Sequence, residues 1–154
     1  MSKKYQVAIL TGGFDPITPA HIEYFKAAKE MFDIVIVFTN SDDWLKRKKG
    51  KAFMPQKDRI AILKAVKYIT QVEGFTADED ADGTAIQAIP RAQEYFPDSD
   101  YFFCNGGDRK PGNTPEEEYC KANGINRAYG VGGEDKQYAS SIYLSEWVKK
   151  NGTN

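Results

Sequence analysis

Short apolar runs alternate along the chain with segments in which apolar residues recur every three or four positions. Residues 5–10 (YQVAIL) and 33–40 (DIVIVFTN) are almost continuously apolar, which is typical of strands buried on both faces of a sheet. The segment between them, 19–32, places Phe25 and Ala28 on one apolar stripe and so predicts an amphipathic helix. The first quarter of the chain therefore predicts a strand, a helix and a second strand.

The same alternation continues after these strands. We expect, in chain order, a loop over 41–51, a helix over 55–68, a strand over 69–75, a helix near 84–96 that Pro90 kinks or splits, a strand over 100–105, a helix over 114–124 capped by Thr114 and ended by Gly124, and a strand over 125–131. No linker or internal repeat interrupts this order. The sequence therefore predicts an α/β fold, a doubly wound parallel five-stranded sheet with helices on both faces, in a single domain over 1–154.

Composition narrows the functional classes. With 21 Lys and Arg against 22 Asp and Glu, the net charge of -1 argues against a general nucleic-acid binder, although 46–51 form a local basic patch. The apolar runs are too short to span a bilayer and the N-terminus leads straight into a strand, so we expect a cytoplasmic protein without membrane contact. Cys104 and Cys120 have neither CxxC spacing nor histidine neighbours, which predicts reduced packing residues.

The most informative motif is GGFDPITPAH, residues 12–21, which joins the first strand to the first helix. A glycine-rich turn leaves backbone N–H groups free, and a helix N-terminus adds positive partial charge where a phosphate can bind. His21, the one histidine of the chain, lies in that first helical turn and would face the same anion. Gly12 and Gly13 would let the backbone approach a nucleotide, or would simply form a tight turn.

This motif resembles the GxFDxxHxGH signature of the cytidylyltransferase-like nucleotidyltransferases, with Thr18 and His21 at the two histidine positions. The segments NSDDWLKRKKG, PQKDRIAIL, NGGD and YASSIYLSEW follow in the family's order, so the resemblance covers nearly the whole chain. The central segments are more similar to heptose-phosphate adenylyltransferases and glycerol-phosphate cytidylyltransferases, and the first motif is more similar to phosphopantetheine adenylyltransferases. The resemblance implies a Rossmann-like nucleotidyltransferase fold.

The resemblance also implies roles for individual residues. Catalysis would rest on His21, Thr18 and Lys48; the nucleotide would contact Gly12, Gly13, Phe14, Asp15, Gly106, Gly107, Asp108, Ser140 and Ser141; and the acceptor's phosphate would contact Lys51 and Arg59. Mg²⁺ would neutralise the triphosphate, and no metal ligands are assigned. Simpler roles stay open: Thr18 as a helix cap, Asp15 orienting the turn rather than holding a hydrated Mg²⁺, Arg59 on a helix surface, and the two serines as caps.

We therefore expect an enzyme that transfers CMP or AMP from CTP or ATP to a phosphorylated sugar or polyol, with release of pyrophosphate. A phosphopantetheine adenylyltransferase is the alternative enzyme. Three departures from the family pattern, at Ala20, Ile142 and Ser145, keep open a different class, a nucleotide-binding sensor or scaffold with weakened catalysis. A homodimer is a further family-based expectation. The acidic run 78–83 (DEDADG) matches only the first half of an EF-hand loop, and we expect a solvated loop there.

Overall fold

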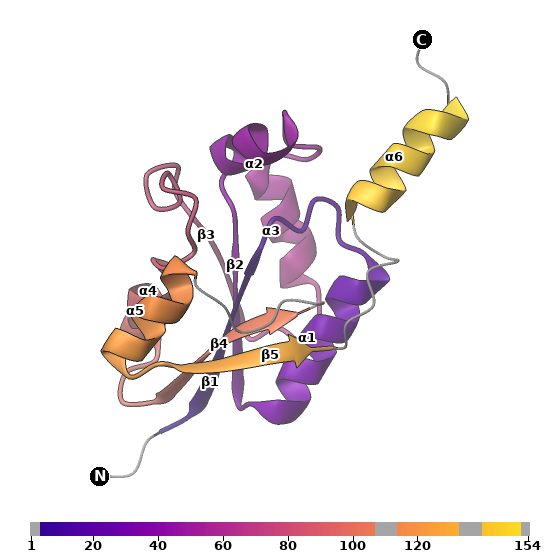
Figure 1. Ribbon diagram of the computed structural model, residues 1–154. Coiled ribbons are helices and arrows are strands. Elements are labelled where there is room, and N and C mark those ends of the chain that lie inside the picture. Colours follow the sequence, from indigo (N-terminus) through magenta and orange to yellow (C-terminus); the bar gives the residue numbers. More distant parts are fainter. Residues whose placement is uncertain (1–3, 107–113, 133–139, 152–154) are drawn as a thin grey trace.

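A computed structural model describes residues 4–106, 114–132 and 140–151 (Figure 1). In this part of the chain, five strands form one parallel sheet in the order β3-β2-β1-β4-β5. The strands are β1 (Gln6–Gly12), β2 (Ile34–Thr39), β3 (Gln71–Gly74), β4 (Asp100–Gly106) and β5 (Asn126–Val131). The predicted parallel five-stranded sheet is confirmed.

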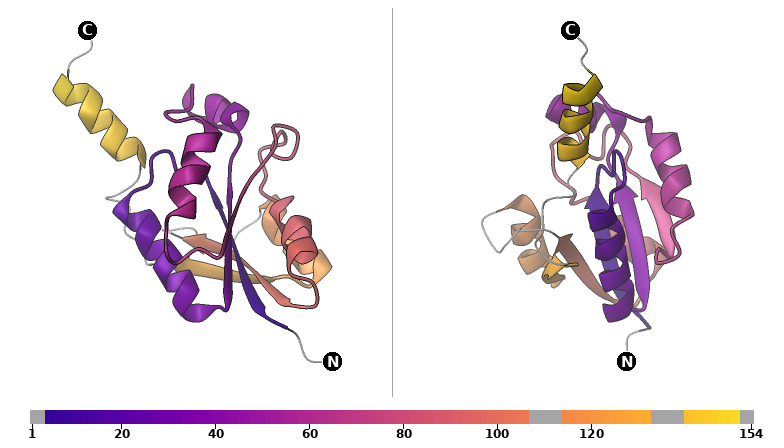
Figure 2. Two further views of the ribbon diagram at one scale, coloured as in Figure 1. Left: turned by 180° about the vertical axis from the view of Figure 1, so that it is seen from behind. Right: turned by 90° about the vertical axis from the view of Figure 1, so that its right-hand side faces the viewer.

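Helices cover both faces of the sheet, as predicted (Figure 2). They are α1 (Pro19–Met31), α2 (Asp42–Lys49), α3 (Gln56–Lys64), α4 (Ala88–Tyr95), α5 (Pro115–Asn123) and α6 (Ser140–Asn151). On one face, Phe25 of α1 and Leu63 of α3 pack with Leu10 and Val37 of the central strands. On the other face, α4 and α5 pack against the opposite side of the same strands, with Ile89 at the centre of that cluster. Figure 1 shows α6 extending away from this body.

The strand order reverses between β1 and β4. The chain first builds outward from β1 through β2 to β3, then returns to place β4 on the other side of β1 and ends with β5 at the far edge. In doubly wound sheets ligands bind at the carboxyl ends of the strands, where such a reversal opens a crevice. The crevice here is therefore expected beyond the ends of β1 and β4.

The prediction of a loop over 41–51 is wrong, because most of this stretch is helix α2. Its N-cap is Ser41, whose Oγ accepts a hydrogen bond from the backbone N–H of Trp44 at 3.1 Å. Two acidic residues stand in its first turn and four basic residues, 46–49, in its last, which matches the helix dipole at both ends. Gly50, with φ of 96°, ends the helix. The charges that suggested a loop therefore stabilise a helix.

Two further predicted helices are shorter than expected. Helix α3 ends at Lys64, because the N–H groups of Ala65 and Val66 bond carbonyls three residues back and tighten the last turn. Helix α4 begins at Ala88, so that Pro90 lies in its first turn, where a missing N–H costs nothing. The helix α5 agrees with the prediction, since Thr114 caps it and Gly124 ends it with φ of 67°.

Candidate active site

The loop between β1 and α1 is held against the end of β2. The carbonyl of Gly12 accepts from the N–H of Asn40 at 3.0 Å, and the carbonyl of Gly13 accepts from Oγ1 of Thr39 at 3.0 Å. A Cβ on Gly13 would lie 3.0 Å from Cδ2 of Leu45 in α2. Close packing against β2 and α2 is therefore enough to explain glycine at this position, and an approach to nucleotide stays a prediction.

The protonation of His21 is set by the cap of its own helix. Its Nδ1 accepts a hydrogen bond from the backbone N–H of Thr18 at 3.0 Å, which places the ring proton on Nε2. Burial, and then the charge of Lys49, lower the pKa of His21 to about 4. At neutral pH the imidazole is therefore neutral. Within the described residues no acceptor takes a hydrogen bond from its Nε2.

Thr18 and Phe14 hold this imidazole in place. Thr18 is the N-cap residue of α1, as the sequence predicted, and its hydroxyl lies 3.4 Å from Nδ1 of His21. The ring of Phe14 is buried and meets the His21 ring edge to face, with centroids 5.0 Å apart. A contact of either residue with a nucleotide stays a prediction. What the described contacts establish is that both orient the histidine.

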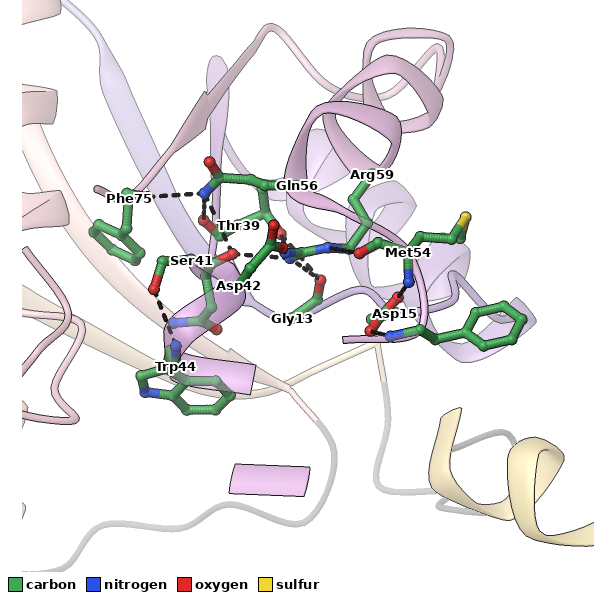
Figure 3. Close-up of polar contacts among 12 residues, drawn as sticks. Gly13, Asp15, Thr39, Ser41, Asp42, Trp44, Met54, Gln56, Arg59 and Phe75 are labelled. Atoms are coloured by element: carbon green, nitrogen blue, oxygen red, sulfur yellow. Dashed lines mark hydrogen bonds and ion pairs between the residues drawn. The ribbon is translucent and has the colours of Figure 1, made fainter. Parts of the chain in front are cut away.

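Asp15 has a structural partner for each of its carboxylate oxygens. The side chain is buried, with Oδ2 accepting from the N–H of Phe53 at 2.6 Å and Oδ1 from the N–H of Met54 at 2.7 Å. These contacts match the predicted role of orienting the turn rather than that of holding a hydrated Mg²⁺. They also fasten the loop 50–55, which carries the exposed Lys51, to the first loop of the site (Figure 3).

The expectation for Arg59 needs correction. Its guanidinium is fully buried rather than on a helix surface, because the protein's own oxygens surround it (Figure 3). Nη2 pairs with Asp42 at 2.6 Å and Nε donates to Met54. The acceptors of Nη1, all within 3.0 Å, are the carbonyls of Gly13 and Asn40 and the hydroxyl of Thr39. Arg59 therefore braces the loops of the site, and in this arrangement its guanidinium is not exposed to an acceptor's phosphate.

Two more side chains complete this brace, the buried Asp80 and the half-buried Gln56, and the sequence analysis missed both. Asp80, from the acidic run, accepts at Oδ1 from the Ser41 hydroxyl at 2.6 Å and at Oδ2 from the Ser41 N–H at 2.8 Å. Gln56 donates from Nε2 to the carbonyl of Phe75 at 2.8 Å and also to those of Thr39 and Asn40. The acidic run is therefore not wholly solvated, since Asp80 points inward and fixes the start of α2.

The basic residues of α2 differ in position. The Nζ of Lys48 lies 5.8 Å from the centroid of the Trp44 ring, on the exposed surface of the helix. Lys49 is the lysine whose charge acts on His21, and the sequence analysis did not single it out. The role of Lys48 at a phosphate stays a prediction.

On the other side of the crevice, β4 ends at Gly106. Gly107 and Asp108 lie outside the described residues, as do the side chains of Ser140 and Ser141 at the start of α6. Next to β4, Arg127 of β5 donates from Nη2 to Oδ1 of Asn105 at 2.6 Å. The sequence analysis gave it no role. It could have been found as a charged residue on a strand position that alternation turns toward a helix-covered face.

The expected cofactor, Mg²⁺, can be compared with these contacts. Among the described residues, no three His, Cys, Asp or Glu side chains gather as metal ligands, and Asp15 is occupied as described. The binding of Mg²⁺ together with a triphosphate stays a prediction.

Both cysteines are free and buried, and burial raises the pKa of Cys104 to about 12. Within the described ranges, no helix is long and apolar enough to cross a bilayer.

Comparisons with known proteins agree with this geometry. Residues 9–111 match the family described as cytidylyltransferase-like. The chain is 35% identical over 74 residues to FAD synthase of Pyrococcus horikoshii, covering 47% of this chain and 50% of that protein. It is 31% identical over 121 residues to the bifunctional protein HldE of Haemophilus influenzae, covering 77% of this chain and 23% of that protein. The chain thus spans half or less of the length of these relatives.

Solved structures share the fold at low sequence identity. A lipopolysaccharide core biosynthesis protein from Thermoplasma volcanium has a TM-score of 0.66 at 19% identity, over 86% of this chain and 100% of that one. A bifunctional NMN adenylyltransferase/ADP ribose pyrophosphatase from Francisella tularensis has a TM-score of 0.56 at 9% identity, over 95% of this chain and 50% of that one. These matches support the arrangement of strands and helices alone.

Proposed function

Since the chain belongs to the cytidylyltransferase-like family, we propose that it transfers a nucleoside monophosphate from ATP or CTP to a phosphorylated small molecule and releases pyrophosphate. The observation that carries the proposal is the state of His21. A neutral imidazole at a helix N-terminus, with its one proton on Nε2 and no acceptor among the described residues, is suited to donate a hydrogen bond to a phosphate oxygen.

The reaction needs charge stabilisation more than proton transfer. An oxygen of the acceptor's phosphate attacks the α-phosphorus, a new P–O bond forms, and the bond to the bridging oxygen of the β-phosphate breaks, so that pyrophosphate takes the electron pair. Negative charge grows on the equatorial and leaving oxygens during this step. Because the pKa of His21 is about 4, it acts in this proposal as a fixed donor rather than as an acid. The N-terminus of α1 and Lys49 add positive potential beside it.

The relatives suggest which substrates to test first. FAD consists of an AMP unit joined to FMN, so the name of the archaeal relative favours ATP as donor and adds FMN to the candidate acceptors. Glycerol 3-phosphate, a heptose 1-phosphate and phosphopantetheine follow from the resemblance stated above. Mg²⁺ is proposed to enter with the triphosphate, whose oxygens would hold it.

The test is pyrophosphate release in the presence of Mg²⁺, with ATP and CTP each crossed against the four acceptors. At least one pair should turn over, and His21→Ala should reduce the rate about a hundredfold, the usual effect of losing one donor to the transition state. Lys26→Ala, at an exposed position of the same helix, is the matched control and should leave the rate unchanged. Equal rates for His21→Ala and the wild type would reject the role of the histidine.

Ala20 favours a second candidate function. It replaces the glycine of the motif one position before His21 and adds a methyl group where the nucleotide is expected to pack. A protein that binds nucleotide without transferring it would show a higher melting temperature with ATP or CTP but no pyrophosphate release from any pair. Restoration of turnover by Ala20→Gly would then identify the methyl group as the cause.

A further inference from the structure

The guanidinium of Arg127 lies in an aromatic slot with part of its hydrogen-bonding capacity unused. Its centre is 5.3 Å from the ring centroid of Phe103 and 4.8 Å from that of Tyr129. Nη2 donates to Asn105, whereas Nε and Nη1 are buried and have no hydrogen-bond partner. Within the described part of the chain, these two are the buried side-chain atoms left without one.

Arg91 shows what a satisfied arginine looks like in the same protein. Its guanidinium also lies against rings, 5.2 Å from the centroid of Phe38. Unlike Arg127, it pairs with Glu73 at 2.6 Å and with Glu79 at 3.1 Å, and it donates to the carbonyl of Gly74. An aromatic slot is therefore used here together with carboxylates, and the slot of Arg127 lacks them.

The acidic side chain that contacts the aromatic slot already has a hydrogen-bond partner. Glu117, in the first turn of α5, accepts the hydroxyl proton of Tyr129 at 3.0 Å and forms no ion pair with Arg127. Arg127 is partly buried, and a partly buried cation without an opposite charge is destabilised, as is a buried donor without an acceptor. An anion bound to the guanidinium would relieve both costs, and a planar guanidinium matches two oxygens of a phosphate at once.

The position of Arg127 favours a substrate as that anion. It pairs in the sheet with Phe103, and its side chain reaches Asn105 two residues further along β4, next to the carboxyl end of the strand. The guanidinium therefore lies near the carboxyl end of β4, on its β5 side, one strand away from the point where the strand order reverses. His21 lies across β4, at the start of the helix that follows β1. The α-phosphate of the nucleotide and the phosphate of the acceptor react with each other, so each needs its own binding residue at the same crevice.

We propose that Arg127 binds the phosphate group of the acceptor, with the nucleotide's phosphates held at His21; this inference rests on the proposed function. Because Nε and Nη1 are buried, a phosphate can reach them only if the guanidinium turns toward the end of β4. That movement gives up the hydrogen bond to Asn105 and gains a charge-assisted pair to phosphate oxygens. Arg127 thereby takes the role that the sequence analysis assigned to Arg59.

The test is a thermal-shift titration of the full chain with two probes at constant ionic strength, inorganic phosphate and a magnesium nucleotide, ATP or CTP. The variants are Arg127→Met, Arg127→Lys in case the first does not fold, His21→Ala, and Arg91→Lys as the matched arginine control. Arg127→Met should weaken phosphate binding about tenfold to a hundredfold, the range for losing hydrogen bonds to a charged group. Its nucleotide affinity should stay within about twofold of the wild type.

The remaining arms separate the sources of phosphate. His21→Ala should weaken nucleotide binding and keep the phosphate-dependent shift, and Arg91→Lys should keep both. The inference is overturned if inorganic phosphate does not stabilise the wild type, if it stabilises Arg127→Met equally, or if Arg127→Met loses nucleotide affinity, which would make Arg127 a triphosphate ligand. Failure of the proposed function looks different, because the wild type would then show no shift with either nucleotide.

Discussion

Two sets of polar side chains around the crevice use their hydrogen-bonding capacity in opposite ways. In the first set, Arg59, Asp15 and Asp80 bond to the protein's own atoms. In the second set, His21 of α1 and Arg127 of β5 are partly buried and keep donors that no described residue uses. A buried group whose partners are all internal builds a frame, whereas one with unused capacity can bind a ligand. Burial and charge alone do not separate these roles, but a count of filled hydrogen bonds does.

Removing Arg59 should produce the largest effect on the frame. Arg59→Met would leave the Met54 carbonyl without this donor, remove one of two donors from the carbonyls of Gly13 and Asn40, and leave Asp42 without its ion pair. We expect a loss of about 3–5 kcal/mol in the free energy of unfolding, measured by urea denaturation. Arg91→Met, which breaks a partly exposed pair, is the control and should cost less. A loss below about 1 kcal/mol for Arg59→Met would contradict the distinction between side chains that brace the site and side chains with unused donors.

A substitution of Asp80, which belongs to the same set as Arg59, should have a smaller effect on the free energy of unfolding. Asp80→Asn replaces one carboxylate oxygen by a donor that faces the N–H and hydroxyl of Ser41, so we expect a loss of about 1–3 kcal/mol in the free energy of unfolding. The matched control is Asp78→Asn in the same acidic run, where the side chain is exposed and makes no described contact. Equal stability of the two variants would show that the acidic run does not fix α2.

The state of His21, one of the side chains with unused donors, can be tested through the pH dependence of stability. Between pH 6.5 and about 4, the unfolded chain protonates His21 while the native chain does not, so native stability falls as pH is lowered through this window. His21→Gln removes this term. Relative to that variant, the wild type should lose up to about 2 kcal/mol more on going from pH 7 to pH 5, measured by urea denaturation. Identical losses would contradict a neutral, enclosed imidazole.

Lys49 should give the smallest effect. Its charge is the second cause of the lowered pKa of His21, after burial. Lys49→Gln should therefore raise the pKa of His21 but leave it below the usual value, because burial remains. An NMR titration of the single imidazole would measure this directly, with Lys48→Gln as the neighbouring control. A return of the pKa to its usual value in Lys49→Gln would instead make the lysine the main cause.

The sequence predicted what local patterns determine. Apolar periodicity was sufficient for the order of the strands and of the helices other than α2, and the glycine-rich turn before His21 was sufficient to place the histidine in the first turn of a helix. The cap Ser41, with acidic residues ahead of basic ones, is a helix signal for α2, whereas the run of lysines by itself predicts a loop.

The arginines show what could not be predicted. Whether Arg59 faces solvent depends on how three loops distant in sequence close around it, and no spacing encodes that closure. Asp80 is hidden for the same reason, since its neighbours in the acidic run are chemically alike and only the packed end of β2 distinguishes it. Arg127 differs, because its inward strand position was visible in the sequence, although its unfilled donors were not.

Most of the partners of Arg59 are main-chain oxygens, those of Gly13, Asn40 and Met54. A carbonyl is present whatever amino acid supplies it, so mutations in these loops can change side chains during evolution without removing the acceptors. The brace is in this sense independent of the residues it joins. A scaffold built this way can change the side chains on its surface while the loops keep their positions.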